Sequence, residues 1–461
     1  MIGFDTLYSW VRELPIVDWH NHLDLAVLAE NKPLGSLYEV WVKADPYKHR
    51  AMRICGEPER VITGDASEDE KWAAWTRTLP KLVGNPLFAW AGQELAWLWD
   101  GRCLAQRRRG AEERWWEGVE NVSLSDWTPA KMLKKFGVEY LSPCVGTREF
   151  LTGFTRFTGL RDEKGINPVN PVNPVQNTYK VTPSLRMNAG DEISVEALEK
   201  FDSAGCRVVD ISVDDASQLS TFNSQLSTVA AYAAAHGWTM LLHLGALRET
   251  SARIRAAAGP AGGFAGMRAP VDPAAVAAFL NGLESTHNVF SRKEDSTRAT
   301  RSTRLNNPVQ NSLPRTILLS LNPEAHASLA VLAGSFNEEG VPGKVQLGPA
   351  WWWCDHEEGI RDVLEKNAAY GVLSTFVGMT TDSRSLLSFV RHDYFRRVLC
   401  KWVAEKVTSG AFPDDESLLR PMMENICYKN AKMFFSTETQ RHGGAEENSE
   451  SLCLCDKIKK C

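Results

Sequence analysis

The stretch Ile16-Val17-Asp18-Trp19-His20-Asn21-His22 decides the fold prediction. It is a short apolar run that ends in two histidines separated by one residue. Successive side chains of a β-strand point to opposite faces, so His20 and His22 would project together from one face of such a strand. Two imidazoles on one face are half of a site for a metal ion such as zinc. Because a lone His-x-His is more often one packed and one hydrogen-bonded histidine, the interpretation depends on ligands from other strands.

Seven further runs rich in β-branched and apolar residues follow, and most of the stretches between them have helical patterns. The eight runs are Ile16–His20, Val138–Ser142, Tyr179–Leu185, Arg207–Val213, Thr239–Leu244, Thr316–Leu321, Lys344–Gly348 and Thr375–Thr381. Strands that alternate with helices indicate a parallel sheet with right-handed crossovers. Eight such units predict an α/β fold, a closed TIM-type (β/α)₈ barrel.

The sequence predicts a single barrel domain over residues 1–440 with unequal connections. A Trp-rich, helix-like insertion spans 44–135 after the first strand, and low-complexity loops span 165–177 and 291–314. The first loop contains Asn167-Pro-Val-Asn-Pro-Val-Asn-Pro174, a three-residue repeat that cannot form a helix. C-terminal helices are predicted over Leu386–Ser409 and Asp415–Phe435, followed by a disordered tail at 441–461.

The composition excludes several classes of protein. Hydrophobic residues make up 43% and charged residues 24%, as in ordinary globular proteins, and the net charge of −5 gives no reason to expect nucleic-acid binding. No apolar run is long enough to cross a bilayer, and the N-terminus lacks the layout of a signal peptide. The ten cysteines are scattered, which predicts reduced thiols in a cytoplasm rather than a disulfide framework.

Polar side chains stand where several of the predicted strands end, and the chemistry of a TIM-type barrel gathers at that rim. The first strand ends in His20 and His22, the fifth carries His243, and the eighth runs into Asp382. This pattern predicts a site for one divalent metal ion with His20, His22 and Asp382 as ligands. His243 would be either a further ligand or a hydrogen-bonding acid or base. The alternative for Asp382 is that it caps the helix that follows.

Two arginines and two tryptophans follow other strand ends. Arg186 and Arg384 would hold an anionic substrate, because a guanidinium binds a carboxylate through two hydrogen bonds, and Trp351 and Trp352 offer faces for a sugar ring. The alternatives are a solvated loop for Arg186, a surface ion pair for Arg384, and core or interface positions for the tryptophans. Together they indicate a small acidic carbohydrate, and they do not separate hydrolysis from isomerisation.

The chain resembles the uronate isomerases (glucuronate isomerases), a family of the amidohydrolase superfamily of metal-dependent hydrolases. The resemblance runs from about Leu14 to Phe435 and rests on long strings in one order. They include Val17-Asp-Trp-His-Asn-His22, Tyr47-Lys-His-Arg-Ala-Met-Arg53, Pro80-Lys-Leu-Val-Gly-Asn-Pro86, His243-Leu-Gly-Ala-Leu-Arg248, Phe376-Val-Gly-Met-Thr-Thr-Asp-Ser-Arg-Ser385 and Arg391-His-Asp-Tyr-Phe-Arg-Arg397.

The resemblance implies a distorted (β/α)₈ barrel with one divalent ion, usually Zn²⁺, and a small hexuronate as substrate. It implies interconversion of D-glucuronate with D-fructuronate or of D-galacturonate with D-tagaturonate. By motif, His20, His22 and Asp382 match the metal site. Tyr47, Arg186, His243, Trp351, Trp352 and Arg384 match the sugar-acid pocket, and Lys48 is grouped with the substrate-binding residues. Asp382 can then act as a base in opening the sugar ring or through a metal-bound water. Tyr47 is the candidate for moving the C2 proton, although its pKa of about 10 would have to fall.

Three departures from the family pattern concern the pocket wall. Pro46 stands where the family has histidine, Ser142-Pro-Cys-Val-Gly-Thr147 stands near a missing Thr-Asp-Asp-Pro string, and Asp355-His356 replaces Asp-Gln. Two rival functions remain open: a hydrolase of the same superfamily and a non-catalytic barrel that binds uronates. Against the hydrolase, the fourth strand offers Asp210 instead of a lysine or histidine for a second metal. A homo-oligomer is compatible with the sequence.

Overall fold

The computed structural model describes residues 1–98, 123–150, 179–188, 191–215, 218–219, 223–260, 262–285 and 313–435. The predicted tail at 441–461 lies outside these residues, as do the two low-complexity loops at 165–177 and 291–314 apart from residues 313 and 314. The predicted insertion at 44–135 is described over 44–98 and 123–135.

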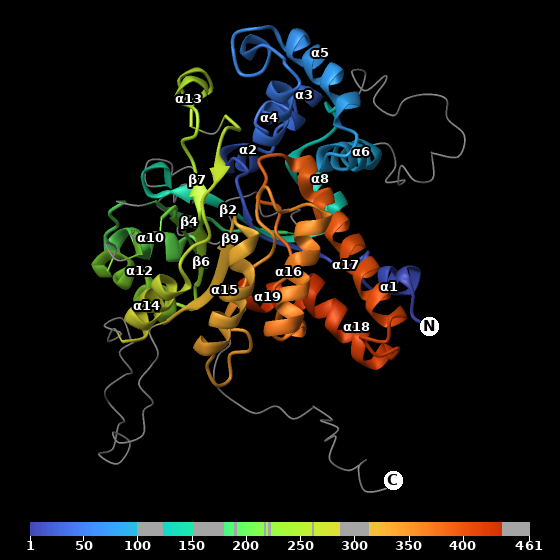
Figure 1. Ribbon diagram of the computed structural model, residues 1–461. Helices are drawn as coiled ribbons and strands as arrows, with labels where there is room; N and C mark the ends of the chain where they lie inside the picture. Colours follow the sequence, from blue (N-terminus) through green and yellow to red (C-terminus); the bar gives the residue numbers. More distant parts are fainter. Residues whose placement is uncertain are drawn as a thin grey trace, which may run out of the picture.

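One parallel sheet forms the centre of the molecule (Figure 1). Its strands follow the order β1-β2-β4-β5-β6-β9-β10, and the short β3 pairs with β2. The bounds are β1 Ile16–Asn21, β2 Val138–Gly146, β3 Lys180–Val181, β4 Ser184–Met187, β5 Val208–Val213, β6 Thr239–Leu244, β9 Arg315–Ser320 and β10 Val345–Leu347. Seven of the eight predicted runs therefore contain strands, and the third is split into β3 and β4.

The prediction of an eighth strand at Thr375–Thr381 is wrong, because this segment does not form a regular strand. Residues 373–375 form a 3₁₀ turn and the chain beyond them is irregular, yet it still lies between β10 and β1. Val377 N donates to Gln346 Oε1 at 2.9 Å beside β10, and Asp382 N donates to His20 O at 3.1 Å beside β1. The backbone is irregular because Gly378 has a φ of +69° and Asp382 a φ of +48°. The segment 376–383 thus completes a distorted (β/α)₈ barrel.

Helices cover the outside of the sheet. Figure 1 shows α10 (Val195–Ser203), α12 (Asn223–Ala235) and α14 (Pro273–Glu284) along one side and α15 (His326–Ala333), α16 (Glu357–Tyr370) and α17 (Val390–Thr408) along the other. Among the described residues, the barrel also has the helices α1 (Phe4–Val11), α8 (Pro129–Phe136), α18 (Glu416–Glu424) and α19 (Asn430–Phe435). None of the described helices has the length and apolar character needed to cross a membrane.

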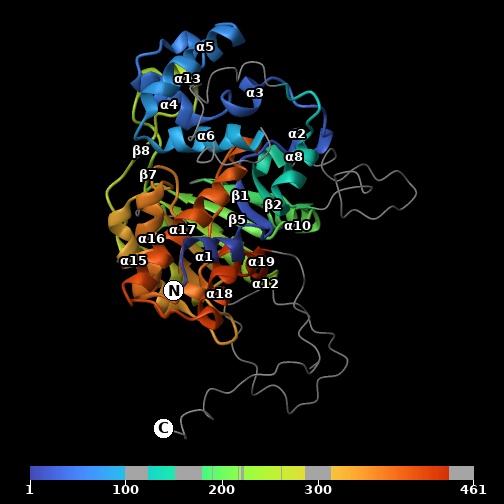
Figure 2. The ribbon, with the colours of Figure 1, turned by 90° about the vertical axis from the view of Figure 1, so that its right-hand side faces the viewer.

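Five helices that follow β1 in the chain, the last three of them within the predicted insertion, stand above the strand ends (Figures 1 and 2). They are α2 (Leu25–Glu30), α3 (Leu37–Trp41), α4 (Pro46–Ile54), α5 (Glu68–Thr78) and α6 (Pro86–Leu98). Local sequence explains two of their starts. Asp45 caps α4, with Pro46 at the first helical position, and Ser67 forms a capping box with Glu70 at the start of α5.

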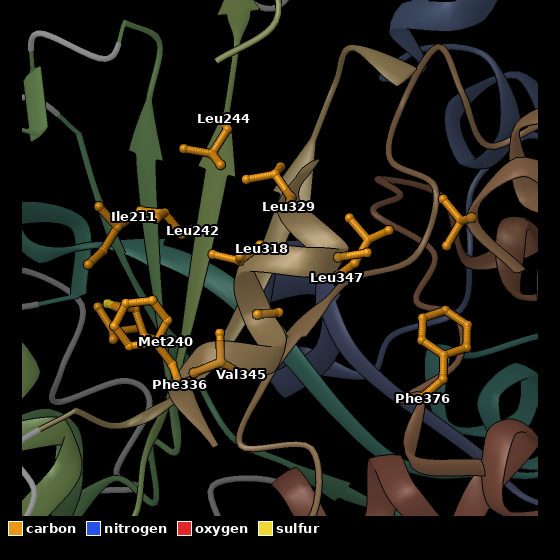
Figure 3. Close-up of a cluster of buried hydrophobic side chains, with 14 of the residues drawn as sticks. Ile211, Met240, Leu242, Leu244, Leu318, Leu329, Phe336, Val345, Leu347 and Phe376 are labelled. Carbon is orange, nitrogen blue, oxygen red and sulfur yellow. The ribbon is translucent and has the colours of Figure 1, made fainter. Parts of the chain in front are cut away.

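Two apolar layers hold the barrel together. Figure 3 shows the outer layer, in which Leu242 and Leu244 of β6 and Leu318 of β9 lie among side chains such as Leu329 and Phe336. An inner layer contains Val17, Trp19, Leu241, Ile317 and Phe435. Trp19 stacks on Phe435 of α19 with ring centroids 4.9 Å apart, so the C-terminal helix closes the end of the barrel opposite the site.

Candidate active site

A cavity of about 490 Å³ opens at the C-terminal ends of the strands. Every site residue predicted from the sequence lines it except Lys48. The lining includes His20, His22, Tyr47, Cys144, Arg186, His243, Arg248, Trp351, Trp352, Trp353, Asp382 and Arg384. The structure therefore brings together side chains that are up to 364 positions apart, from His20 to Arg384.

An arm of the chain after β6 roofs one side of the cavity. It comprises β7 (Ala246–Leu247), α13 (Ala252–Ala258) and β8 (Gly266–Met267), and it reaches α4 of the insertion (Figure 1). Arg53 of α4 donates to Gly262 O, and a Cβ at Gly263 would lie 2.2 Å from Pro46 O. Because Gly263 also has a φ of +77°, this close approach of arm and helix requires glycine.

His20, His22 and Asp382 form a group that can hold one metal ion. Asp382 Oδ1 lies 3.2 Å from His20 Nε2 and 3.0 Å from His22 Nε2. Ligand atoms about 2.1 Å from one ion lie about 3.0 Å apart at a right angle and about 3.4 Å apart at the tetrahedral angle. The buried His20 Nε2 has no hydrogen-bond partner among the described residues. The donor set and its spacing thus fit a divalent cation.

Asp382 does not act as a helix cap. The 3₁₀ helix that follows it is capped by Ser385, whose side chain accepts from Leu387 N. Instead, the second oxygen of Asp382 accepts a 2.9 Å hydrogen bond from Trp351 Nε1, which orients the carboxylate towards the histidines. Burial would raise the pKa of Asp382, but the contacts of its carboxylate with the imidazoles of His20 and His22 outweigh burial and hold the pKa well below the usual range.

Burial keeps two cavity histidines neutral. It lowers the pKa of His22 to about 4 and that of His243 to about 3. A neutral imidazole is the form that binds a metal ion or accepts a hydrogen bond from a substrate hydroxyl. His243 also packs edge-on against Trp351, with ring centroids 4.4 Å apart.

Asp210 of β5 anchors the wall opposite Asp382. Its fully buried carboxylate accepts a 3.0 Å hydrogen bond from Arg186 Nη1, and Oδ1 lies 3.4 Å from His243 Nε2. Arg186 Nη2 donates to Ser212 Oγ at 3.1 Å, so its guanidinium is held beside the cavity rather than in a solvated loop. The sequence feature that could have predicted this role is the aspartate within the otherwise largely apolar strand Val208–Val213.

A second buried cluster surrounds Tyr47. The Tyr47 hydroxyl donates a hydrogen bond to Asp355 Oδ2 at 3.0 Å, and it accepts one from Trp353 N at 3.2 Å. Arg391 Nη1 donates to the same carboxylate at 3.0 Å. Burial and the charge of Asp355 raise the pKa of Tyr47 well above 10, so the phenol stays protonated. Arg391 belongs to a string that carries the family resemblance and Asp355 to one of the departures from the family pattern, and neither was predicted as a site residue.

Arg384 lines the cavity and makes no ion pair in the part of the chain that the structure describes. Its charge is therefore available to an anion. Trp351 is buried, and Trp352 packs edge-on against it with centroids 5.5 Å apart. The tryptophans thus belong to both the core and the cavity wall.

Lys48 is not brought to the cavity. Its buried Nζ lies 2.6 Å from Asp45 Oδ2 and 3.6 Å from Glu94 Oε2, and 5.1 Å from the centre of the Trp41 ring. Consecutive residues of a helix point about 100° apart. Tyr47 therefore faces the cavity, whereas Lys48 faces the core of the insertion.

Comparisons with known proteins point to one family of enzymes. The glucuronate isomerase family matches residues 4–148 and 290–435, which include every predicted site residue except Arg186 and His243. A uronate isomerase of Caldicellulosiruptor bescii is 32% identical over 93% of this chain and 95% of that protein. One of Bacillus licheniformis is 31% identical over 94% of this chain and 95% of that protein.

Solved structures share the fold. The uronate isomerase of Thermotoga maritima superposes with a TM-score of 0.71 at 23% identity, covering 94% of this chain and 97% of that one. The glucuronate isomerase of Caulobacter crescentus gives a TM-score of 0.70 at 18% identity, covering 95% of each chain. The predicted fold, family resemblance and enzyme class, an aldose–ketose isomerase, are confirmed. The chain belongs to the glucuronate isomerase family.

Proposed function

We propose that the protein interconverts an aldohexuronate and its ketose, D-glucuronate with D-fructuronate or D-galacturonate with D-tagaturonate. The observation that carries the proposal is the meeting of His20, His22 and Asp382 beside two arginines in one cavity of a chain from this family. The cavity volume of about 490 Å³ lies within the range of small-molecule sites. The six cysteines that the structure describes are all free, which supports a reducing cytoplasm as the compartment.

Arg186 and Arg384 are the proposed anion-binding residues. Arg186 is held by Asp210, whereas the guanidinium of Arg384 lies at the cavity wall without an ion pair to any described residue. We assign the substrate carboxylate and the oxygens that gain charge during the reaction to these two groups. Trp352 and the edge of Trp351 would contact the C–H face of the sugar.

The metal ligands have a defined task in this proposal. A divalent ion held by His20, His22 and Asp382, which we propose to be Zn²⁺, would act as a Lewis acid and stabilise charge on the substrate's C1 and C2 oxygens. Asp382 would also accept the proton of the anomeric hydroxyl when the sugar ring opens. The neutral His243 would donate or accept a hydrogen bond at a sugar hydroxyl.

Proton transfer between C2 and C1 is assigned to Tyr47 together with Asp355. A tyrosinate is disfavoured here, because the pKa of Tyr47 is raised by burial and by Asp355. The phenol can instead take the C2 proton while it passes its own proton to Asp355, to which it already donates at 3.0 Å. Reversal of the relay delivers a proton to C1, while the O2 proton moves to O1, so no net proton is gained or lost.

Tyr47→Phe is expected to lower kcat by about 10²–10⁴-fold, because it removes the relay hydroxyl but keeps the ring. The KM should change far less. The measurement is ketose formation together with the exchange of deuterium at C2. Tyr394→Phe is a matched control, since Tyr394 packs on the same Trp90 ring but does not line the cavity. Equal exchange rates in Tyr47→Phe and wild type would remove Tyr47 from the relay.

Lys48→Met is expected to lower stability without changing substrate affinity. The variant leaves the buried carboxylates of Asp45 and Glu94 without their cation, which costs about 3–5 kcal/mol for a buried pair. Thermal unfolding should show the loss, whereas the KM of the folded enzyme should stay within about twofold. A KM raised tenfold at unchanged stability would return Lys48 to the substrate-binding group.

A ketose assay with the purified chain tests the proposed function. Glucuronate and galacturonate are supplied separately, before and after removal of metal by a chelator and again after addition of Zn²⁺. We expect ketose from at least one uronate, loss of the activity with chelation, and recovery with Zn²⁺. Hydrolysis of lactones or esters without ketose formation would favour the related hydrolases. Binding of glucuronate without any ketose would favour a non-catalytic barrel.

One observation weighs against a hydrolase with two metal ions. The place beside Asp210 where a second cation would stand is taken by the guanidinium of Arg186, 3.0 Å from Asp210 Oδ2. A further cation there would meet an existing positive charge.

A further inference from the structure

Cys144 bridges a proposed metal ligand and the buried anchor Asp210. It lies in β2, and its Sγ is 3.1 Å from His20 Nδ1 and 3.3 Å from Asp210 Oδ2. Ser184 Oγ of β4 donates to the same sulfur at 3.3 Å. The thiol therefore connects side chains from three neighbouring strands, β1, β4 and β5, at the floor of the cavity.

The direction of these hydrogen bonds follows from the donors available. An ionised carboxylate only accepts, so the single hydrogen of the thiol is donated to Asp210 Oδ2. The sulfur can then only accept from His20, which requires a proton on Nδ1. In the neutral imidazole that binds a metal ion, a proton on Nδ1 leaves the lone pair on Nε2, the atom that lies 3.2 Å from Asp382 Oδ1.

Asp210 extends the connection to the substrate side of the cavity. The same carboxylate accepts from Arg186 Nη1 at 3.0 Å and lies 3.4 Å from His243 Nε2. Asp210 is fully buried, so its position depends on these partners rather than on water. A change in the position of Cys144 would therefore alter the positions of both the His20 imidazole and the Arg186 guanidinium.

We propose that Cys144 is a positioning residue that holds His20 in its metal-binding tautomer and ties it, through Asp210, to Arg186 and His243. The proposal rests on the proposed function only in that His20 binds the metal ion. Outer partners of metal-bound histidines typically contribute 10–100-fold to metal affinity. These partners are usually carboxylates or carbonyls, and here a thiol stands between the histidine and the carboxylate.

A different arrangement of the same atoms is the main competitor. His20 Nδ1, Cys144 Sγ and Asp210 also satisfy the spacing of a metal-binding group, so the sulfur could itself be a ligand. Against this, the Arg186 guanidinium already neutralises Asp210. Sulfur ligation and outer positioning make opposite spectroscopic predictions, which the experiment uses.

The test measures metal affinity and needs no substrate. Zn²⁺ binding by full-length wild type, Cys144→Ala and Cys144→Ser is measured by competition with a chromophoric chelator. We expect Cys144→Ala to bind Zn²⁺ about 10–100-fold more weakly. Cys144→Ser should lie between it and wild type, because a hydroxyl can also donate to Asp210 and accept from His20. Cys206→Ala is the matched control: this buried thiol precedes β5, donates to Val208 O at 3.2 Å, and does not line the cavity.

Two further measurements make the outcomes unambiguous. Thermal unfolding of the metal-free proteins shows whether Cys144→Ala is folded, and Cys144→Ser serves as the test variant if it is not. The Co²⁺-loaded wild type should lack a thiolate-to-cobalt charge-transfer band. That band, or wild-type Zn²⁺ affinity in both Cys144 variants, would overturn the proposal. Absence of isomerase activity with the affinity pattern intact would instead count against the proposed function alone.

Discussion

Replacing Asp382 with asparagine is expected to reduce hexuronate isomerisation on the order of 100-fold or more while leaving the fold intact. The variant loses the anionic oxygen that lies 3.0 Å from His22 Nε2 and 3.2 Å from His20 Nε2. A metal ion acting as a Lewis acid supplies several kcal/mol of transition-state stabilisation, and each 1.36 kcal/mol corresponds to tenfold in rate. The proposed base for ring opening is lost at the same time.

Asparagine is the right replacement because the backbone of Asp382 is unusual. Its φ of +48° is in the left-handed region, which asparagine tolerates better than other residues with a Cβ. The amide oxygen can still accept the hydrogen bond from Trp351 Nε1. Alanine would add backbone strain and leave the indole N–H without its acceptor, so its effect on the rate would be harder to interpret.

The measurements are kcat, Zn²⁺ affinity and the thermal midpoint of Asp382→Asn. Asp362→Asn is the control, since the Asp362 carboxylate lies 2.7 Å from His326 Nδ1 and neither residue lines the cavity. We expect normal turnover in the control. Turnover near that of wild type in Asp382→Asn would show that another residue carries the chemistry assigned here.

Most of the fold could be predicted because its strands are buried on both sides. Residues 208–213 and 239–244 are buried throughout, and they are mostly apolar instead of alternating between apolar and polar. The eighth run, Thr375–Thr381, has a similar composition, but it forms no regular backbone ladder with β1. Hydrogen bonds to the side chain of Asp18 hold it there instead. Thr380 Oγ1 and Thr381 N both donate to Asp18 Oδ1 at 2.7 Å, contacts that join residues more than 360 positions apart. Spacing within a run carries no information about such contacts.

The site could be predicted where chemistry and strand ends coincide. His20, His22 and Asp382 stand at the ends of two runs, and parallel strands bring those ends together. Lys48 was grouped with the pocket because it follows Tyr47, although a helix turns neighbouring residues to different sides. Asp355 was noted only as part of a departure from the family pattern, since its contact with Tyr47 spans 308 positions.

Asp18→Ala is expected to be the most destabilising single change near the site, by about 3–5 kcal/mol. Asp18 is fully buried and accepts from Thr380 Oγ1, Thr381 N and Thr381 Oγ1 at 2.7–2.8 Å, with His392 Nε2 at 3.4 Å. Removal of the carboxylate leaves Thr381 N and Thr381 Oγ1 without this buried acceptor, whereas Thr380 Oγ1 can still donate to His20 O at 2.6 Å. Each lost bond to a charged group costs about 1.5–3 kcal/mol before relaxation.

The same change should also weaken metal binding, because Asp18 clamps the irregular segment 376–383 onto β1. Asp382 follows Thr381 directly, so loosening the clamp lets its carboxylate move away from the histidines. A shift of about 1 Å in a ligand is enough to spoil a metal site. We therefore expect Zn²⁺ affinity to fall at least about tenfold, although Asp18 lines no part of the cavity.

Lys48→Met separates this effect from general loss of stability. It breaks a buried ion pair of similar expected cost in the insertion, away from the metal ligands. Because a chain of 461 residues need not unfold in a single step, the thermal midpoint and the Zn²⁺ affinity are compared directly instead of one unfolding free energy. Both variants should melt several degrees below wild type, and only Asp18→Ala should bind Zn²⁺ more weakly. If the two variants bound Zn²⁺ equally well, the position of Asp382 would not depend on Asp18, and the barrel's eighth segment would be held by its backbone contacts alone.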